Sequence, residues 1–257
     1  MTKSANTFLL LLLTLGISQA QELSFEEYNP ESTLVIPGNR VIRAKFPVVD
    51  VHSHHYNMPE QDLSVVVRAM DTLNLAVLVN LSGGSGEKIK GAMANIQKNY
   101  PNRFLLFANV DFSGVGDPGW GARAASQLKE DHANGAVGLK IFKSLGLRYS
   151  DTEGNRIAVD DPRLDPVWEM CATLGIPVLI HSADPKSFWD PMDSRNERWL
   201  ELKTRPRRKR SDSDPAPWEQ IIAEQHNLFR KHPKTTFINA HKGWYANNLD
   251  RLSELME

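Results

Sequence analysis

The sequence predicts an α/β protein built as a TIM-like (β/α) barrel, and three observations support this fold class. Short apolar or β-branched runs alternate with longer segments of helical period along most of the chain. This order implies parallel strands joined by right-handed crossovers. In addition, histidines end several of the predicted strands, and the carboxyl ends of the strands are where a (β/α) barrel places its active site.

The composition fits one large globular domain. Of the 257 residues, 41% are hydrophobic and 24% are charged, as in an ordinary soluble fold. The formal net charge of −1 gives no reason to expect nucleic acid or an anionic membrane as a partner, so we expect a small-molecule substrate. Self-association into a homo-oligomer stays open. The single cysteine, Cys171, excludes an internal disulfide and is expected to be a buried apolar side chain.

Residues 1–20 have the features of a signal peptide. Lys3 precedes an apolar run that begins at Phe8, and Ser18 and Ala20 place small residues at the two positions that a signal peptidase reads. A membrane anchor is the weaker alternative, because the run is shorter than the ~20 apolar residues that cross a bilayer. We therefore expect cleavage after Ala20 and an exported protein, periplasmic or secreted, with no membrane contact afterwards.

The rest of the chain is expected to form a short extension and one domain. In residues 21–46, the strand-like runs 33–36 and 40–43 flank a Pro-Gly-Asn turn signal and predict a small hairpin. The barrel domain is expected to occupy residues 47–257. It carries an insertion at 185–217 that is long for a loop of a compact domain.

After the apolar run that opens at Val48, the pattern predicts five more strands and five helices. The predicted strands are residues 76–81, 104–110, 136–142, 177–181 and 236–241, and the predicted helices are residues 64–73, 87–99, 119–134, 162–174 and 218–231. No nucleotide-binding glycine fingerprint follows any strand, which favours a barrel over a doubly wound sheet. The glycine-rich stretch 82–86 is predicted to be a flexible active-site loop rather than a phosphate cradle.

The first strand ends in two histidines separated by one residue. Successive strand side chains point to opposite faces, so His52 and His54 project to one side with Asp50, and Val51 and Ser53 project to the other. Two imidazoles placed in this way can bind one metal ion. An isolated H-x-H motif is equally compatible with a hydrogen-bonded pair at a loop mouth.

Two further strands also end in histidine, His181 on the fifth and His241 on the sixth, and the fourth strand carries Lys140 in phase with Gly138 and Phe142. Four histidines from three strand ends on one rim predict a metal site. A divalent ion held by neutral imidazoles lowers the pKa of bound water toward ~7 and polarises a carbonyl oxygen, which suits hydrolysis of an amide, ester or lactone. In a decarboxylation the same ion would stabilise charge as carbon dioxide leaves, and the sequence does not separate the two reactions.

The strand order of these motifs resembles the amidohydrolase superfamily of metal-dependent barrel enzymes. The stretches D-V-H-S-H at residues 50–54 and F-I-N-A-H at residues 237–241 look most like its amidohydrolase-related (amidohydrolase 2) branch, which contains hydrolases and non-oxidative decarboxylases. The resemblance implies the metal-dependent hydrolase fold.

The resemblance implies different roles for the four histidines. His52, His54 and His181 would bind one divalent metal, commonly zinc, and His241 would lie beside the bound water or substrate. Members also end an eighth strand with an aspartate, and this sequence stops at Glu257, shortly after its sixth strand. We therefore expect six of eight strand-helix units, that is, an N-terminal portion with weak metal binding, a tendency to aggregate and little activity. A catalytically inactive truncated barrel stays open as an alternative.

Other residues near this rim are candidates for substrate binding. Lys140 is expected to be an unmodified amine, in a salt bridge or in contact with an anionic substrate, rather than a carbamylated bridge between two metals. Lys143 and Arg148 are candidates for a substrate carboxylate, with solvated surface charge as the alternative, and Trp244 is placed at the mouth. The basic run 205–210 is expected to be a solvated loop that could attract anionic substrates.

Overall fold

The structure is a computed structural model that describes Ser24, residues 26–35, Gly38 and residues 41–257. The chain divides into two units, Met1–Pro37 and Gly38–Glu257. The expected signal peptide lies outside the described residues. The described residues of the first unit contain no helix or strand.

The predicted hairpin does not form in the described residues. Residues 33–35 and 41–43 are not in strands, and most of the predicted turn lies outside the described part of the chain. Residues 43–44 instead contact the end of helix α1 (Leu63–Leu73). The Ala44 amide donates to the Leu73 carbonyl at 3.1 Å, and the Arg43 guanidinium donates to the Thr72 carbonyl at 3.1 Å. These residues are therefore tied to a helix end rather than to a partner strand.

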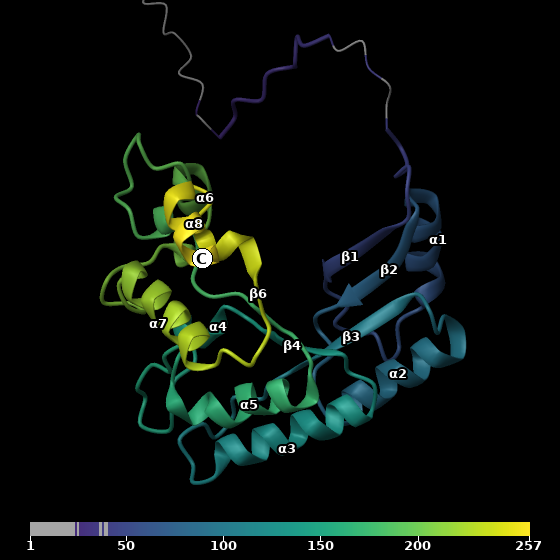
Figure 1. Ribbon diagram of the computed structural model, residues 1–257. Helices are drawn as coiled ribbons and strands as arrows, with labels where there is room; N and C mark the ends of the chain where they lie inside the picture. Colours follow the sequence, from purple (N-terminus) through teal and green to yellow (C-terminus); the bar gives the residue numbers. More distant parts are fainter. Residues whose placement is uncertain (1–23, 25, 36–37, 39–40) are drawn as a thin grey trace, which may run out of the picture. The chain divides into compact units, whose positions relative to one another are not determined.

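The second unit contains one six-stranded sheet whose strands are parallel and follow one another in sequence order. The strands are β1 (Val48–Ser53), β2 (Leu75–Asn80), β3 (Phe104–Asn109), β4 (Gly138–Ile141), β5 (Val178–Ile180) and β6 (Phe237–Asn239). The sheet curls into a half-barrel whose crossover helices cover one of its faces (Figure 1). The predicted α/β class and the partial (β/α) barrel are thus confirmed.

The five predicted helices are present, and shorter helices accompany them. The helices are α1, α2 (Glu87–Asn99), α3 (Trp120–Ala133), α4 (Ser144–Leu147), α5 (Asp165–Leu174), α6 (Trp199–Thr204), α7 (Trp218–Lys231) and α8 (Leu249–Met256), and the 3-10 helices are η1 (Pro162–Leu164), η2 (Lys186–Phe188), η3 (Pro206–Arg208) and η4 (Ala240–Trp244). The sequence does not predict α4 and α6, because each is too short to show a helical period.

Helix ends follow local sequence signals. The Asp62 carboxylate caps α1 by accepting from the Ser64 amide at 2.9 Å, a contact worth about 1 kcal/mol. Helix α5 ends at Gly175, whose φ of 65° is a left-handed conformation that glycine adopts without a Cβ clash. These signals fix the residue at which α1 begins and the residue at which α5 ends.

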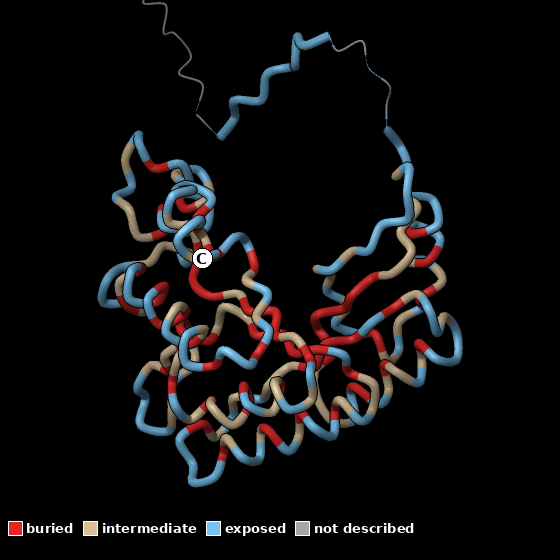
Figure 2. Tube along the Cα trace, viewed as in Figure 1, coloured by how far each residue is buried: buried red, intermediate tan, exposed pale blue. Residues whose placement is uncertain are grey.

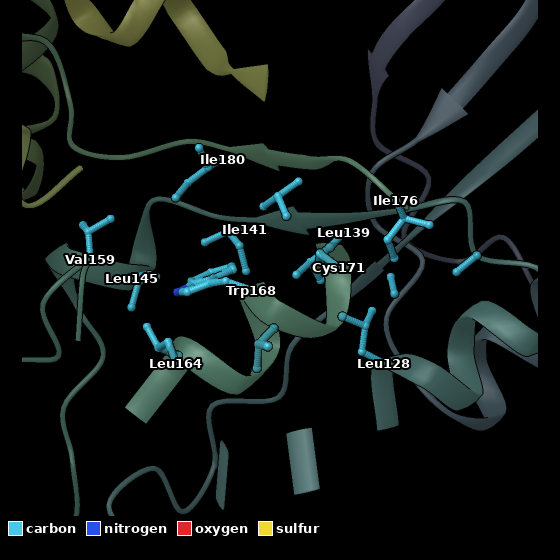
Figure 3. Packing of buried hydrophobic residues seen from close by; sticks show 14 of the residues in the cluster. Leu128, Leu139, Ile141, Leu145, Val159, Leu164, Trp168, Cys171, Ile176 and Ile180 are labelled. Atoms are coloured by element: carbon cyan, nitrogen blue, oxygen red, sulfur yellow. The ribbon is translucent and has the colours of Figure 1, made fainter. Parts of the chain in front are cut away.

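The main core lies between the sheet and its helices. Leu139, Ile141 and Ile180 of the strands pack with Trp168 and Cys171 of α5, and all five are fully buried (Figure 3). Truncation of a buried Trp to Ala costs about 3–5 kcal/mol, so this contact is a large part of the stability of the unit. The expected burial of Cys171 is confirmed, and burial raises the pKa of its thiol to about 12.

A smaller cluster lies apart from the main core. Along the strands, its residues alternate with residues of the main core. It is formed by Val79, Leu81, Phe107, Leu179 and Ala240. Buried residues follow the strands β2 to β5, whereas the edge strands β1 and β6 have none, and many exposed residues lie on the outer surfaces of the helices (Figure 2). In the described part of the chain, no helix has the length and apolar character needed to cross a membrane.

Candidate metal centre

Four histidines from three strand ends lie together at the carboxyl side of the sheet. His52 lies within β1 and His54 directly follows it, His181 directly follows β5, and His241 lies two residues beyond β6. The ring centroids of His52 lie 5.3 Å from His54 and 5.7 Å from His241, and those of His181 and His241 are 4.4 Å apart. The structure therefore brings together all four histidines that the sequence places on one rim.

His181 is the most buried of the four. Its Nε2 is buried and has no hydrogen-bond partner among the described residues. Burial, followed by the charges of His241 and Lys140, lowers the pKa of His181 to about 2. The ring is therefore neutral at physiological pH and keeps a free lone pair, which is the state that binds metal.

The other three imidazoles are also held in the neutral form. Loss of hydration and then the nearby Lys140 ammonium lower the pKa of His52, His54 and His241 below the ordinary value of 6.5. His54 and His241 are exposed and His52 is partly buried, so the group lies open to a ligand.

A left-handed turn gives His241 its direction. Asn239, two residues earlier on β6, faces helix α7, because its amide donates to Gln225 Oε1 at 2.9 Å. Strand alternation would turn His241 the same way. Instead His241 has φ 57° and Lys242 has φ 55°, and the His241 ring stacks on Trp244 with centroids 4.8 Å apart. Non-glycine residues in this conformation cost about 1–2 kcal/mol each, so packing holds a strained turn that aims His241 at His181.

Trp244 forms a wall of the group. Its indole Nε1 donates to the Ser182 carbonyl at 2.6 Å, and its ring lies 5.5 Å from that of His181. Trp244 therefore supports two imidazoles, and contact with substrate stays a prediction.

Lys140 lies near all four histidines. It is 1% exposed, and its Nζ has no hydrogen-bond partner in the described part of the chain. Its Nζ lies 5.5 Å from the centroid of the Phe142 ring. Burial lowers the pKa of Lys140 to about 8, and its charge in turn lowers the pKa of each of the four histidines. The expected salt bridge of Lys140 is not formed, which leaves the alternative of an anionic substrate.

The donor set fits a divalent metal in kind. Two imidazoles on one tetrahedral zinc ion have ring centroids roughly 5 Å apart, since each Zn–N bond is about 2.0–2.1 Å. Of the three predicted ligands, His52 and His54 have this spacing, with ring centroids 5.3 Å apart. However, no three His, Cys, Asp or Glu side chains among the described residues already form a group that could hold a metal ion. The convergence predicted for His52, His54 and His181 is therefore not preformed, and their rings would have to turn on binding.

Lys143 has a different partner from the predicted substrate carboxylate. Its Nζ pairs with the carboxylate of Asp184, which is buried after β5, and Arg210 pairs with the same carboxylate at 3.1 Å. Asp184 therefore pairs with both cations, and the side chain of Lys143 stays 30% exposed. The sequence places Asp184 three residues after the strand-ending His181. Arg148 is exposed, which agrees with its alternative as a surface charge.

The glycine-rich stretch 82–86 is hydrogen-bonded to β3 and α3. The amide of Gly83 donates to Phe107 O at 3.2 Å, that of Gly84 to Asn109 Oδ1 at 2.8 Å, and that of Gly86 to Asp131 Oδ1 at 2.7 Å. A Cβ at Gly83 would lie 2.4 Å from the Phe107 carbonyl oxygen, so only glycine allows this approach. The stretch links β2 to α2, and its mobility stays a prediction.

The basic run 205–210 is only in part a free loop. Besides the Arg210 pair, Lys209 donates to the Phe188 carbonyl at 3.0 Å, and the Arg208 guanidinium lies 5.1 Å from the centroid of the Phe188 ring. Phe188 is 1% exposed, and the Trp189 indole donates to the Ala216 carbonyl at 2.9 Å. The contacts of Arg208, Lys209 and Trp189 lie within the insertion, and the pair of Arg210 with Asp184 ties the run to the segment after β5. Arg205 and Arg207 are exposed, as expected of a solvated loop.

Comparison with solved structures gives partial matches at low identity. A crystal structure of 2,6-dihydroxybenzoate decarboxylase complexed with 2,6-dihydroxybenzoate has 21% identity and a TM-score of 0.43, with 72% of this chain and 56% of that chain covered. A crystal structure of amidohydrolase II has 13% identity and a TM-score of 0.47, with 80% and 71% covered. The 5-carboxyvanillate decarboxylase of Novosphingobium aromaticivorans, complexed with manganese, has 21% identity and a TM-score of 0.45, with 74% and 53% covered.

The chain therefore spans little more than half the length of two of these three structures. No curated protein matches the sequence. The family described as Amidohydrolase, in contrast, matches residues 45–257, which include the whole sheet and all four histidines. On this match, the chain belongs to the amidohydrolase family.

Proposed function

We propose that the chain is a metal-dependent hydrolase that acts on an amide, ester or lactone with one bound Zn²⁺ ion. The observation that carries the proposal is the group of four neutral imidazoles at the carboxyl side of the sheet, with the buried Nε2 of His181 free of partners. Neutral imidazole nitrogen is a preferred ligand of zinc.

Within this proposal, His52, His54 and His181 would hold the ion, which would supply Lewis acidity for water activation and for polarisation of the substrate carbonyl. His241 is exposed, and its pKa is lowered by loss of hydration, so its ring is neutral and can accept a proton at physiological pH. Its stacking on Trp244 fixes the ring plane while that proton moves.

Lys140 indicates the class of substrate. An ammonium that is 1% exposed and has no partner among the described residues lacks a counter-charge. With a pKa of about 8, it is mostly protonated at neutral pH. A carboxylate on the substrate would supply the missing charge, so we propose a carboxylate-bearing small molecule.

Non-oxidative decarboxylation is the second candidate, and the unpaired charge of Lys140 is also the observation that favours it. In that reaction, the substrate carboxylate beside Lys140 would be the group that leaves as carbon dioxide. In the hydrolase, it would serve only for binding. Export to the periplasm or the medium, through cleavage after Ala20, is proposed on the sequence pattern alone.

The test is a parallel assay of zinc-loaded protein. One panel contains amides, esters and lactones with and without a carboxylate, and a second panel contains hydroxylated benzoates that are monitored for carbon dioxide. Hydrolysis that favours carboxylated substrates and disappears in His52→Ala supports the first proposal. Release of carbon dioxide without hydrolysis favours the second. Hydrolysis that His52→Ala leaves unchanged contradicts both.

A further inference from the structure

Strand β2 ends in Asn80, which is fully buried and organises the backbone around His54. Asn80 Oδ1 accepts from the His55 amide at 2.9 Å, and its Nδ2 donates to the His55 carbonyl at 3.0 Å. On the other side of His54, the Ser53 carbonyl accepts from the Leu81 amide at 2.9 Å. The chain is therefore fixed to β2 both before and after His54.

The same Asn80 positions Ser82. Its Oδ1 also accepts from the Ser82 amide at 3.0 Å, and Ser82 is 2% exposed. The Ser82 hydroxyl lies 2.8 Å from Nδ1 of His54 and has no other hydrogen bond in the described part of the chain. One buried amide thus fixes both the backbone beside the imidazole and the hydroxyl that contacts its ring.

This contact determines which nitrogen of His54 is available. A neutral imidazole has one N–H and one lone pair, and a hydroxyl can accept from the N–H or donate to the lone pair. If Ser82 Oγ accepts from Nδ1–H, the lone pair is on Nε2, the nitrogen that does not face Ser82. Partners of this kind orient metal-binding histidines, and their loss typically costs 10–100-fold in metal affinity.

We propose that Ser82, held by Asn80, is a positioning residue for His54: its hydroxyl oxygen accepts Nδ1–H and leaves the Nε2 lone pair free to bind a divalent metal. The contact between Ser82 and His54 stands on the structure, whereas the direction of the hydrogen bond and the metal part of this inference rest on the proposed function. Ser53 offers a matched control, because it directly precedes His54 in the chain but its hydroxyl donates to the Val79 carbonyl at 2.8 Å.

The experiment compares the full chain with its Ser82→Ala and Ser53→Ala variants. Long-range ¹H–¹⁵N correlation spectra of histidine-labelled, metal-free protein report the tautomer of His54, and a His54→Gln variant assigns its signals. Titration with Co²⁺, followed by visible absorption, reports affinity. We expect the Nδ1–H tautomer in the unmodified chain and in Ser53→Ala, and a loss of that preference in Ser82→Ala. Co²⁺ affinity should fall about 10–100-fold in Ser82→Ala and remain near its original value in Ser53→Ala.

The two readouts separate the inference from the proposed function. An Nε2–H tautomer in the unmodified chain, or a tautomer that Ser82→Ala does not change, would overturn the inference whether or not metal binds. Equal losses of affinity in Ser82→Ala and Ser53→Ala would also overturn it, because they indicate general loosening of the loop. If the tautomer follows Ser82 and no variant binds Co²⁺, the positioning role stands and the proposed metal function fails.

Discussion

The imidazole of His181 meets that of His241 edge to face, with ring centroids 4.4 Å apart and ring planes at 71°. The two side chains follow neighbouring strands, β5 and β6, and differ in environment. His181 has a buried nitrogen without a partner among the described residues, whereas His241 is exposed on a strained turn. We assign metal binding to the buried ring and proton transfer to the exposed one.

This assignment predicts different effects for the two substitutions. In a full-length form, His241→Asn should lower kcat by roughly 10²–10⁴ for a substrate found in the panels above, because a proton-transfer group is lost, and bound metal should be nearly unchanged. His181→Asn should lose metal together with activity. Activity and metal content are measured on the same samples. Loss of metal in His241→Asn would show that His241 is a ligand and that the assignment is wrong.

Burial of Lys140 predicts a pH-dependent stability. Its pKa is about 8 in the folded chain and 10.5 in the unfolded chain. Below pH 8 both states hold the proton, so the full penalty of a buried charge is present. Between pH 8 and 10.5 the unfolded chain binds more protons, so folding becomes more favourable as pH rises, and above this range the penalty is absent.

Lys140→Met should therefore stabilise metal-free protein at pH 7 by on the order of 3 kcal/mol, since its pKa falls from 10.5 to about 8 and each pKa unit corresponds to about 1.4 kcal/mol. The gain should shrink between pH 8 and 10.5. Urea denaturation at pH 7 and pH 10 measures it, and Lys234→Met on the surface is the control. A gain that is independent of pH would contradict a buried, ionisable Lys140.

Asp184 predicts how the insertion is held. Its side chain is 2% exposed and pairs with Lys143 of the β4 loop and Arg210 of the insertion. Asp184→Asn should destabilise the chain by about 3 kcal/mol, because two cations lose a buried partner. It should also speed tryptic cleavage within 205–210. Asp193→Asn removes an exposed pair with Arg195 and should change stability by under about 1 kcal/mol. Equal effects of the two substitutions would show that the Asp184 contacts do not anchor the insertion.

Much of the fold is predictable from the sequence, because the spacing of apolar residues within each segment distinguishes a helix from a strand. Helices α2 and α7 have the predicted bounds, and Leu139 and Ile141 face the helices as strand alternation requires. In the described part of residues 33–43 the predicted strands are absent, and Arg43 and Ala44 instead contact α1, about 30 residues away in sequence. The residue pattern of one short segment does not show contacts with residues far away in the sequence.

The candidate site also contains residues that the sequence identifies and residues that only the structure shows. The four histidines are identifiable because strand ends meet at one edge of a parallel sheet. The partners of Lys143 and of the run 205–210 are not, because pairing depends on how the insertion packs. Ser82 and Asn80 carry no motif, and only the structure shows that they contact His54 and its neighbour.

The central claim is that the histidine group binds a divalent metal. The direct measurement is the zinc and manganese content of purified chain by inductively coupled plasma mass spectrometry, after dialysis against each ion and then metal-free buffer. The full chain is compared with a His52→Ala and His54→Ala double variant and with His132→Ala, whose ring Nδ1 lies 2.8 Å from the Ala136 carbonyl oxygen near the end of α3. We predict clearly more bound ion in the full chain and in His132→Ala than in the double variant, at the level below one ion per chain that the expected weak binding implies. Equal metal content in all three proteins would contradict the account.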